Sequence, residues 1–212
     1  MNEQLQPGAV LTSQCGAQYT VEKFLGDGAQ GEVYDVTCGG RHYALKWYYP
    51  HVAILAQKKA LEELLRRGSP DSRFLWPQDL LSGGGDLGYI MPLRPSRYKG
   101  INALLKRRVE PSFAALSRAV YNMTQAYEKL HAEGLCYRDI SRGNVFFDPD
   151  TGDVLICDTD NVSPSGTYDS LINGTPRFMA PEIVRGEARP SRETDLFSLA
   201  VLMFYMLMVA HP

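Results

Sequence analysis

Apolar and polar residues alternate along residues 18–49, which is the spacing of β-strands with one buried face. Two glycine-containing turns interrupt the alternation, Gly26-Asp27-Gly28 and Cys38-Gly39-Gly40. The pattern therefore predicts three antiparallel strands. Residues 1–17 show no such regularity, and we expect them to form a weakly ordered lead-in.

Residues 52–67 change to a helical spacing, which ends at Gly68-Ser69-Pro70. Four apolar side chains share one face of this predicted helix: Ile54, Leu61, Leu64 and Leu65. Two more strands are expected near residues 74–81 and 87–93.

The second half of the chain has a mainly helical pattern. Helices are predicted over residues 112–133 and 193–210, with a β-hairpin over residues 144–157 between them. Residues 159–181 have the composition of a loop.

Together these elements indicate an α+β chain in three parts. A β-rich part of five strands and one helix covers residues 18–91. A connector follows over residues 92–99, and a mainly helical part covers residues 100–212.

Composition excludes several classes of protein. Hydrophobic residues make up 44% of the 212 residues and the formal net charge is −2, which is typical of a globular domain and not of a disordered chain or a basic nucleic-acid-binding protein. The longest apolar stretch, residues 196–210, is shorter than the roughly 20 residues of a membrane-spanning helix. Residues 1–10 lack the features of a signal peptide, and the four cysteines form no C-x-x-C pair, so we expect a cytoplasmic protein.

A glycine-rich motif with Gly26, Gly28 and Gly31 joins the first two predicted strands. Without side chains, backbone N–H groups can approach phosphate oxygens closely. Dinucleotide-binding folds carry the same spacing before a helix, whereas here a strand follows; an ordinary glycine-rich hairpin is the other alternative. Lys46, on the third predicted strand, can reach the space below the glycines with its amine, unless it faces solvent.

Oxygen-bearing side chains in the second half have a spacing suited to proton and metal chemistry. Asp139 and Asn144 lie on one predicted loop, and Asp158 follows the second strand of the predicted hairpin. Asp139 can accept or orient a hydroxyl proton, and oxygens of Asn144 and Asp158 suit Mg²⁺. A lone Asp in a turn more often caps the backbone or faces water.

Residues 174–182 read Gly-Thr-Pro-Arg-Phe-Met-Ala-Pro-Glu, and residues 195–201 read Asp-Leu-Phe-Ser-Leu-Ala-Val. With the preceding motifs, and in this order, they resemble the signatures of eukaryotic-type protein kinases of the Ser/Thr branch. The resemblance implies a bilobal kinase fold, with the β-rich part as the N-lobe, the connector as the hinge and the helical part as the C-lobe. It also implies transfer of the γ-phosphoryl group of ATP, with Mg²⁺, to a Ser or Thr hydroxyl of a protein substrate.

The resemblance assigns ATP contacts to these residues: Gly26, Gly28, Gly31, Val33, Ala44, Lys46, Glu62, Met91 and Leu93. Lys46 is expected to contact the α- and β-phosphates and to pair with a glutamate of the helix over residues 52–67. Glu62 lies nearer the apolar face than Glu63 and is the preferred partner. Gln57 is also on the apolar side, but it follows Lys46 too closely along the chain.

In the helical part, Asp139 matches the catalytic base, and Asn144 and Asp158 match the metal ligands. Thr175 matches the residue that ties the substrate-binding loop to Asp139. Two further acidic residues match structural anchors of the C-lobe: Glu182 and Asp195.

Four positions depart from the family pattern. Tyr137 replaces the usual His, and Ser141 replaces a Lys that contacts the γ-phosphate. Thr159 and Asp160 replace the usual Phe-Gly pair, and Arg142 is a candidate for the charge that Ser141 lacks. These departures leave two alternatives open, a nucleotide-binding pseudokinase or scaffold and a small-molecule kinase of related fold.

Arg138 suggests regulation, because in related kinases a phosphate on the following loop pairs with this arginine. The candidate phosphate acceptors are Ser163, Ser165, Thr167, Tyr168 and Ser170. The chain ends at Pro212, soon after the apolar helix, so we expect either an incomplete C-lobe or a partner chain that covers this helix.

Overall fold

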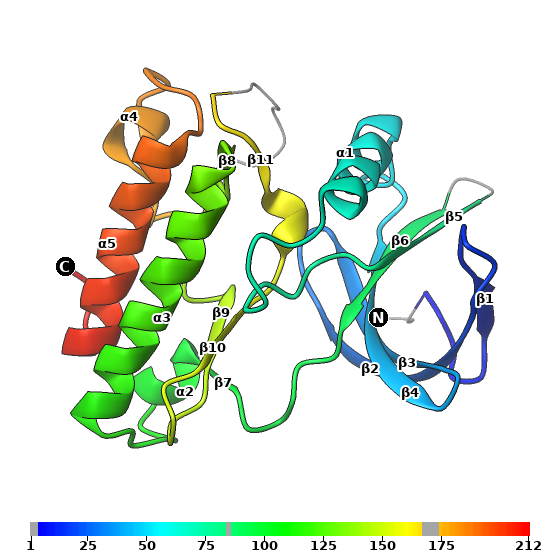
Figure 1. Cartoon of the computed structure of the whole chain (residues 1–212), viewed down its shortest axis with the longest axis horizontal. Helices are drawn as coiled ribbons and strands as arrows, with labels where there is room; N and C mark the ends of the chain where they lie inside the picture. The colour runs from blue at the N-terminus through cyan, green and yellow to red at the C-terminus, as the bar shows by residue number, and fades with distance from the viewer. Residues whose placement is uncertain (1–3, 84–85, 167–173) are drawn as a thin grey trace. The chain divides into compact units, whose positions relative to one another are not determined.

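The computed structural model describes residues 4–83, 86–166 and 174–212, which form two compact units (Figure 1). The first unit comprises the chain up to Ser69 together with Leu75–Arg94, and the second comprises Pro70–Phe74 and Pro95–Pro212. Residues 70–74 were expected in the first part, but Phe74 forms a parallel bridge with Ile156. The Ile156 N–H also donates to the Arg73 carbonyl at 2.8 Å, so this short segment packs with the second unit.

The first unit is built on a six-stranded sheet in the order β1-β2-β3-β4-β6-β5, with antiparallel neighbours throughout. Its strands are β1 (Val10–Thr12), β2 (Gln18–Asp27), β3 (Gly31–Cys38), β4 (Arg41–Tyr48), β5 (Asp79–Gly83) and β6 (Asp86–Pro92). The alternating pattern thus located β2, β3 and β4 correctly. The strand expected near residues 74–81 begins later, at Asp79.

The expectation of a weakly ordered lead-in over residues 1–17 was wrong for part of this segment. Strand β1 pairs with β2, and Leu5, Ala9 and Leu11 pack against the buried core of the sheet. A strand of three residues is too short to show an alternating pattern in the sequence, so β1 is recognised only from its pairing with β2.

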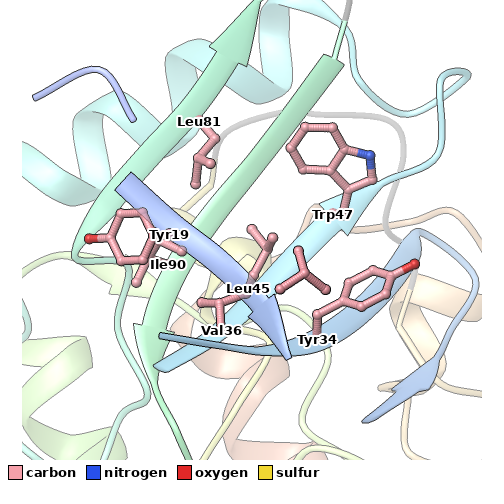
Figure 2. Close-up of a cluster of buried hydrophobic side chains, with 8 residues drawn as sticks. Tyr19, Tyr34, Val36, Leu45, Trp47, Leu81 and Ile90 are labelled. Carbon is pink, nitrogen blue, oxygen red and sulfur yellow. The ribbon is translucent and has the colours of Figure 1, made fainter. Parts of the chain in front are cut away.

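One face of the sheet carries the hydrophobic core (Figure 2). Tyr34 lies opposite Leu45, and Leu45 lies opposite Ile90, so these side chains share one face. The core cluster consists of Tyr19, Val21, Tyr34, Val36, Leu45, Trp47, Leu81 and Ile90. Because side chains alternate along β4, Ala44, Lys46 and Tyr48 lie on the other face.

Helix α1 (Leu55–Arg67) completes the first unit. Leu61 and Leu64 are buried, and the Trp76 indole donates to the Leu64 carbonyl at 2.9 Å, which fixes the end of the helix. Ile54 was predicted on the buried face but is the N-cap residue and is 40% exposed.

The second unit contains helices α2 (Ile101–Leu105), α3 (Phe113–Ala132), α4 (Pro181–Val184) and α5 (Arg192–Met208), with a 3₁₀ turn, η1, at Thr159–Asn161. Ser112 caps α3, and Ser191 with Thr194 forms a capping box on α5. The long helices α3 and α5 lie side by side (Figure 1). No helix in the described part of the chain is both long and apolar enough to cross a membrane.

Short strands connect the helices of the second unit. They form the sheet β10-β9-β7 from β7 (Lys99–Gly100), β9 (Val145–Phe147) and β10 (Val154–Ile156), and the pair of β8 (Leu135–Cys136) with β11 (Ser163–Pro164). The β9–β10 hairpin is the predicted one. Helix α3 holds its turn, since Asn122 Nδ2 donates to the Gly152 carbonyl and Arg118 Nη1 to the Thr151 carbonyl, both at 3.0 Å.

Gly152 provides a test of this packing. Its φ is +76°, and a Cβ there meets the Ala115 carbonyl oxygen at 2.4 Å, whereas Gly134, with φ +73°, has open space. We expect Gly134→Ala to cost about 1 kcal/mol from the backbone conformation alone. Gly152→Ala adds a clash with α3 and is expected to cost at least about 2 kcal/mol more. Urea denaturation of both variants measures the difference, and equal free energies of unfolding contradict this packing.

The burial of the Cys136 thiol can also be tested. Burial raises the pKa of this thiol to about 11 from its ordinary 9.0. Between pH 9 and pH 11 the unfolded thiol therefore loses its proton while the folded one keeps it, so stability falls as the pH rises. We expect this loss to reach about 2 kcal/mol by pH 11 in the wild type and to be missing from Cys136→Ala. Identical pH slopes of the unfolding free energy in the two proteins are the contradicting result.

Candidate active site

Four of the predicted nucleotide residues share the sheet face opposite the hydrophobic core. Val33 on β3 lies directly across from Lys46 on β4, and Ala44 lies across from Met91 on β6. Paired residues of antiparallel strands point to the same side, and Ala44 and Lys46 are two apart on one strand. The strand register therefore brings an aliphatic surface and an amine together. Leu93 follows directly after β6.

The glycine-rich loop, residues 26–31, connects β2 and β3 next to this face. Gly31 is required by the fold, because a Cβ there meets the Trp47 carbonyl oxygen at 2.1 Å. At Gly26 and Gly28 a Cβ meets nothing within 4 Å, so no contact of the described chain demands glycine there. The space left open is what close approach of phosphate oxygens to backbone N–H groups requires.

The Lys46 side chain is only 5% exposed, so its ammonium group depends on acceptors within the protein. Its Nζ donates to Gln30 Oε1 at 2.9 Å and lies 5.5 Å from the centre of the Tyr48 ring. The Tyr48 hydroxyl in turn accepts a hydrogen bond from Gln57 Nε2 of α1 at 3.1 Å.

The structure does not bring Lys46 and Glu62 together. Glu62 is exposed and forms no ion pair with any described residue. Glu63 pairs with Arg66 and Arg67 on the helix surface, and hydrogen bonds from these arginines lower the pKa of Glu63. The link between α1 and the Lys46 strand is made by Gln57, which the sequence analysis had set aside.

In the second unit, two residues hold the Asp139 carboxylate from opposite sides. Thr175 Oγ1 donates to Asp139 Oδ1 at 2.7 Å, and Asn144 Nδ2 donates to Oδ2 at 3.1 Å. Asn144 Nδ2 also donates to the Asp139 backbone carbonyl at 2.9 Å. Three of the predicted site residues are therefore joined by direct hydrogen bonds.

The loop that carries Asp139, residues 137–144, is anchored by a buried carboxylate of α5. Asp195 is 2% exposed and accepts the backbone N–H groups of Tyr137 at 2.5 Å and of Arg138 at 3.0 Å. His131 Nε2 of α3 lies 3.0 Å from the same carboxylate. Asp195 therefore fixes the start of this loop, in agreement with its expected role, whereas the Glu182 side chain makes no ion pair within the described ranges.

Asp158 is held at the turn that follows β10. It has φ +51° and precedes η1, while the Cys157 N–H donates to the Asn144 carbonyl at 3.0 Å. The Tyr137 hydroxyl donates to the Cys157 carbonyl, and Arg138 Nε donates to the Asn161 carbonyl at 2.5 Å. These bonds tie the Asp158 turn to the loop that carries Asp139.

Asn144 and Asp158 fit a hard cation such as Mg²⁺. The side-chain nitrogen of Asn144 donates to Asp139, whereas Asn144 Oδ1 makes no hydrogen bond to a described residue. This oxygen is therefore available to a cation beside the Asp158 turn. Mg²⁺ is usually held by one or two protein oxygens together with phosphates and water. In the described chain, no group of three His, Cys, Asp or Glu side chains is placed to hold a metal ion by itself.

The positions that depart from the kinase pattern are mostly engaged in the structure. Ser141 is buried, and its Oγ accepts the Gly143 N–H at 3.3 Å. Arg142 is exposed and donates to the Tyr205 hydroxyl of α5 at 3.4 Å. Thr159 and Asp160 are both buried within η1. Burial strongly raises the pKa of Tyr137, so its hydroxyl stays protonated as a donor.

The candidate phosphate acceptors are only partly described. Thr167, Tyr168 and Ser170 lie outside the described residues. Ser163 is part of β11, and Ser165 Oγ accepts the N–H of Arg192 at 3.1 Å. Arg138 Nε is already bonded to the Asn161 carbonyl, so pairing with a phosphate requires Arg138 to change or extend its contacts.

Sequence reasoning missed two residues that contact the site. Gln30 lies inside the glycine-rich loop but was treated only as a spacer between Gly28 and Gly31. Tyr137 was noted as a replacement for His, yet its hydroxyl bond to Cys157 was not foreseen. In both cases a polar side chain within a motif was the available signal.

Comparison with known proteins identifies the family of this chain. The protein kinase domain family matches residues 19–212. Serine/threonine-protein kinase PkaB of Streptomyces coelicolor is 26% identical over 93% of this chain and 50% of its own length. The DNA damage-responsive serine/threonine-protein kinase RqkA of Deinococcus radiodurans is 28% identical over 94% of this chain and 30% of its own length. Serine/threonine-protein kinase pkn3 of Myxococcus xanthus is 20% identical over 90% of this chain and 37% of its own length.

The chain thus spans half or less of the length of these three relatives. The family match covers nearly all of the chain, and the relatives are all serine/threonine-protein kinases. This protein belongs to the protein kinase domain family, with the bilobal kinase fold expected from its sequence.

Proposed function

We propose that this chain is an ATP-dependent serine/threonine-protein kinase domain, which transfers the γ-phosphoryl group of ATP to a hydroxyl group of a protein. The observation that carries the proposal is the hydrogen-bonded set of Thr175, Asp139 and Asn144. It presents a carboxylate of fixed orientation beside an amide oxygen suited to Mg²⁺.

The first unit supplies the proposed ATP site. Open space at Gly26 and Gly28 accommodates phosphates, and the Lys46 amine contributes positive charge to the α- and β-phosphates. The aliphatic face below the loop suits the adenine ring, with contacts assigned to Val33, Ala44, Met91 and Leu93. Pro92 lacks an N–H, so it can offer the adenine edge only its carbonyl.

The second unit supplies the proposed acceptor site. Asn144 and Asp158 are the assigned ligands of Mg²⁺, which neutralises phosphate charge when bound. Asp139 accepts or orients the proton of the acceptor hydroxyl. As the hydroxyl oxygen forms its bond to the γ-phosphorus, the bond from that phosphorus to the β–γ bridging oxygen breaks, and the electron pair leaves with ADP.

Two alternatives remain, and both are motivated by departures from the kinase pattern: Ser141, Thr159 and Asp160 for a pseudokinase, and Ser141 for a small-molecule kinase. Ser141 cannot supply the charge of the Lys that it replaces, and its hydroxyl is already engaged with Gly143. Weak or absent transfer despite ATP binding is the mark of a pseudokinase. Transfer only to small hydroxyl compounds is the mark of a small-molecule kinase.

Incubation with labelled ATP, Mg²⁺ and a generic protein substrate tests the proposal. We expect the wild type to form phosphoprotein and Asp139→Asn, of the same size but without the charge, to lose at least about 100-fold in rate. ATP binding without transfer supports the pseudokinase instead. Transfer confined to small hydroxyl compounds supports a small-molecule kinase.

Thr175 offers a finer test of the same set. Thr175→Val keeps the shape but removes the hydroxyl that holds Asp139 Oδ1, and we expect kcat to fall about ten-fold or more with the KM for ATP unchanged. Thr175→Ser keeps the hydroxyl and is expected to retain most of the activity. A wild-type kcat in Thr175→Val contradicts this role.

A further inference from the structure

We infer that the Gln30 side-chain amide competes with nucleotide phosphates for the Lys46 amine and thereby weakens phosphate binding. The inference rests on the proposed ATP site of the first unit. Gln30 is a positioning residue, because it acts through Lys46.

The backbone around Gln30 is fixed to β4. The Tyr49 N–H donates to the Gln30 carbonyl at 2.9 Å, and the Gly28 N–H donates to the Gly31 carbonyl at 2.9 Å. Gly31 itself lies so close to β4 that it has no room for a Cβ. The Gln30 side chain therefore starts from a fixed point at the end of the glycine-rich loop, within reach of Lys46.

The contact engages the amine that is assigned to the phosphates. Gln30 Oε1 and Lys46 Nζ are 2.9 Å apart, so nothing fits between the two groups. The open space at Gly26 and Gly28 lies in the same loop. A phosphate that contacts both this loop and the Lys46 amine therefore competes with the amide for that amine.

The chemistry of the acceptor makes the contact reversible. A buried ammonium group loses its hydration and needs acceptors, and the Gln30 amide oxygen is one of these. The centre of the Tyr48 ring lies 5.5 Å from the same nitrogen. An amide is neutral, whereas a phosphate oxygen is charged and forms the stronger hydrogen bond. Gln30 can therefore satisfy the Lys46 ammonium group and still be replaced by a nucleotide phosphate.

Two substitutions change this contact in opposite directions. Gln30→Ala removes the competing oxygen, and we expect ADP, in the presence of Mg²⁺, to bind about five-fold more tightly. Gln30→Glu has the same shape but pairs a carboxylate with the amine, and we expect ADP to bind at least about ten-fold more weakly. Gln18→Glu adds the same charge at an exposed position of β2 and serves as the control, with wild-type affinity.

Adenosine, which has no phosphate, separates this inference from the proposed function. Isothermal titration calorimetry is expected to give one adenosine affinity for all four proteins, which also shows that each variant is folded. If the wild type binds neither adenosine nor ADP, the proposed ATP site and this inference both fail. If adenosine binds but ADP affinity is equal in all four, or is weaker in Gln30→Ala, the inference alone is overturned.

Discussion

The second unit depends on one buried carboxylate. Asp195 is charged, almost inaccessible to water and fixed on α5, so it needs hydrogen-bond donors from its surroundings. It finds them in two successive backbone N–H groups of the loop that carries Asp139. These hydrogen bonds hold the loop against helices α3 and α5. The Tyr137 hydroxyl and the Asn144 carbonyl then bond to the backbone of Cys157, which fixes the Asp158 turn beside the loop. The proposed acceptor site is thus a consequence of satisfying one buried charge.

The first unit is organised by strand register. Because β3, β4 and β6 pair without a bulge, Val33, Lys46, Ala44 and Met91 fall on one face while the core residues fall on the other. A shift of one residue on β4 exchanges the two faces and buries the Lys46 amine in the hydrophobic cluster. Burial of the core residues therefore stabilises this strand register, and the register places the proposed nucleotide-binding residues on one face.

Local sequence signals predicted the strands and helices that are long enough to show a regular spacing of apolar residues. Alternation located β2 to β4, helical spacing located α1, α3 and α5, and motif spacing selected the three residues that bond to one another around Asp139. Where a contact depends on tertiary structure, local signals failed. Strand β1 exists because β2 has a free edge, and residues 70–74 join the second unit through Ile156 and Lys129.

The same limit applies within the site. Helical geometry ranked Glu62 above Glu63 as the partner of Lys46, and Gln57 was set aside because it follows Lys46 too closely along the chain. Both choices assume a direct ion pair with Lys46. In the structure Gln57, five residues before Glu62 on α1, is linked to the strand through the Tyr48 hydroxyl. Gln30 was overlooked for a similar reason, since the path of the loop decides where its amide reaches.

The central proposal is that this chain binds ATP together with Mg²⁺. Calorimetric titration of ATP in Mg²⁺ tests it most directly, with the wild type, Lys46→Met in the first unit and Asp158→Asn in the second. The account predicts one ATP per chain and weaker binding in both variants, with the effect of Asp158→Asn disappearing when Mg²⁺ is chelated. Two sites per chain, or an Asp158→Asn variant with wild-type affinity for Mg²⁺–ATP, contradict it.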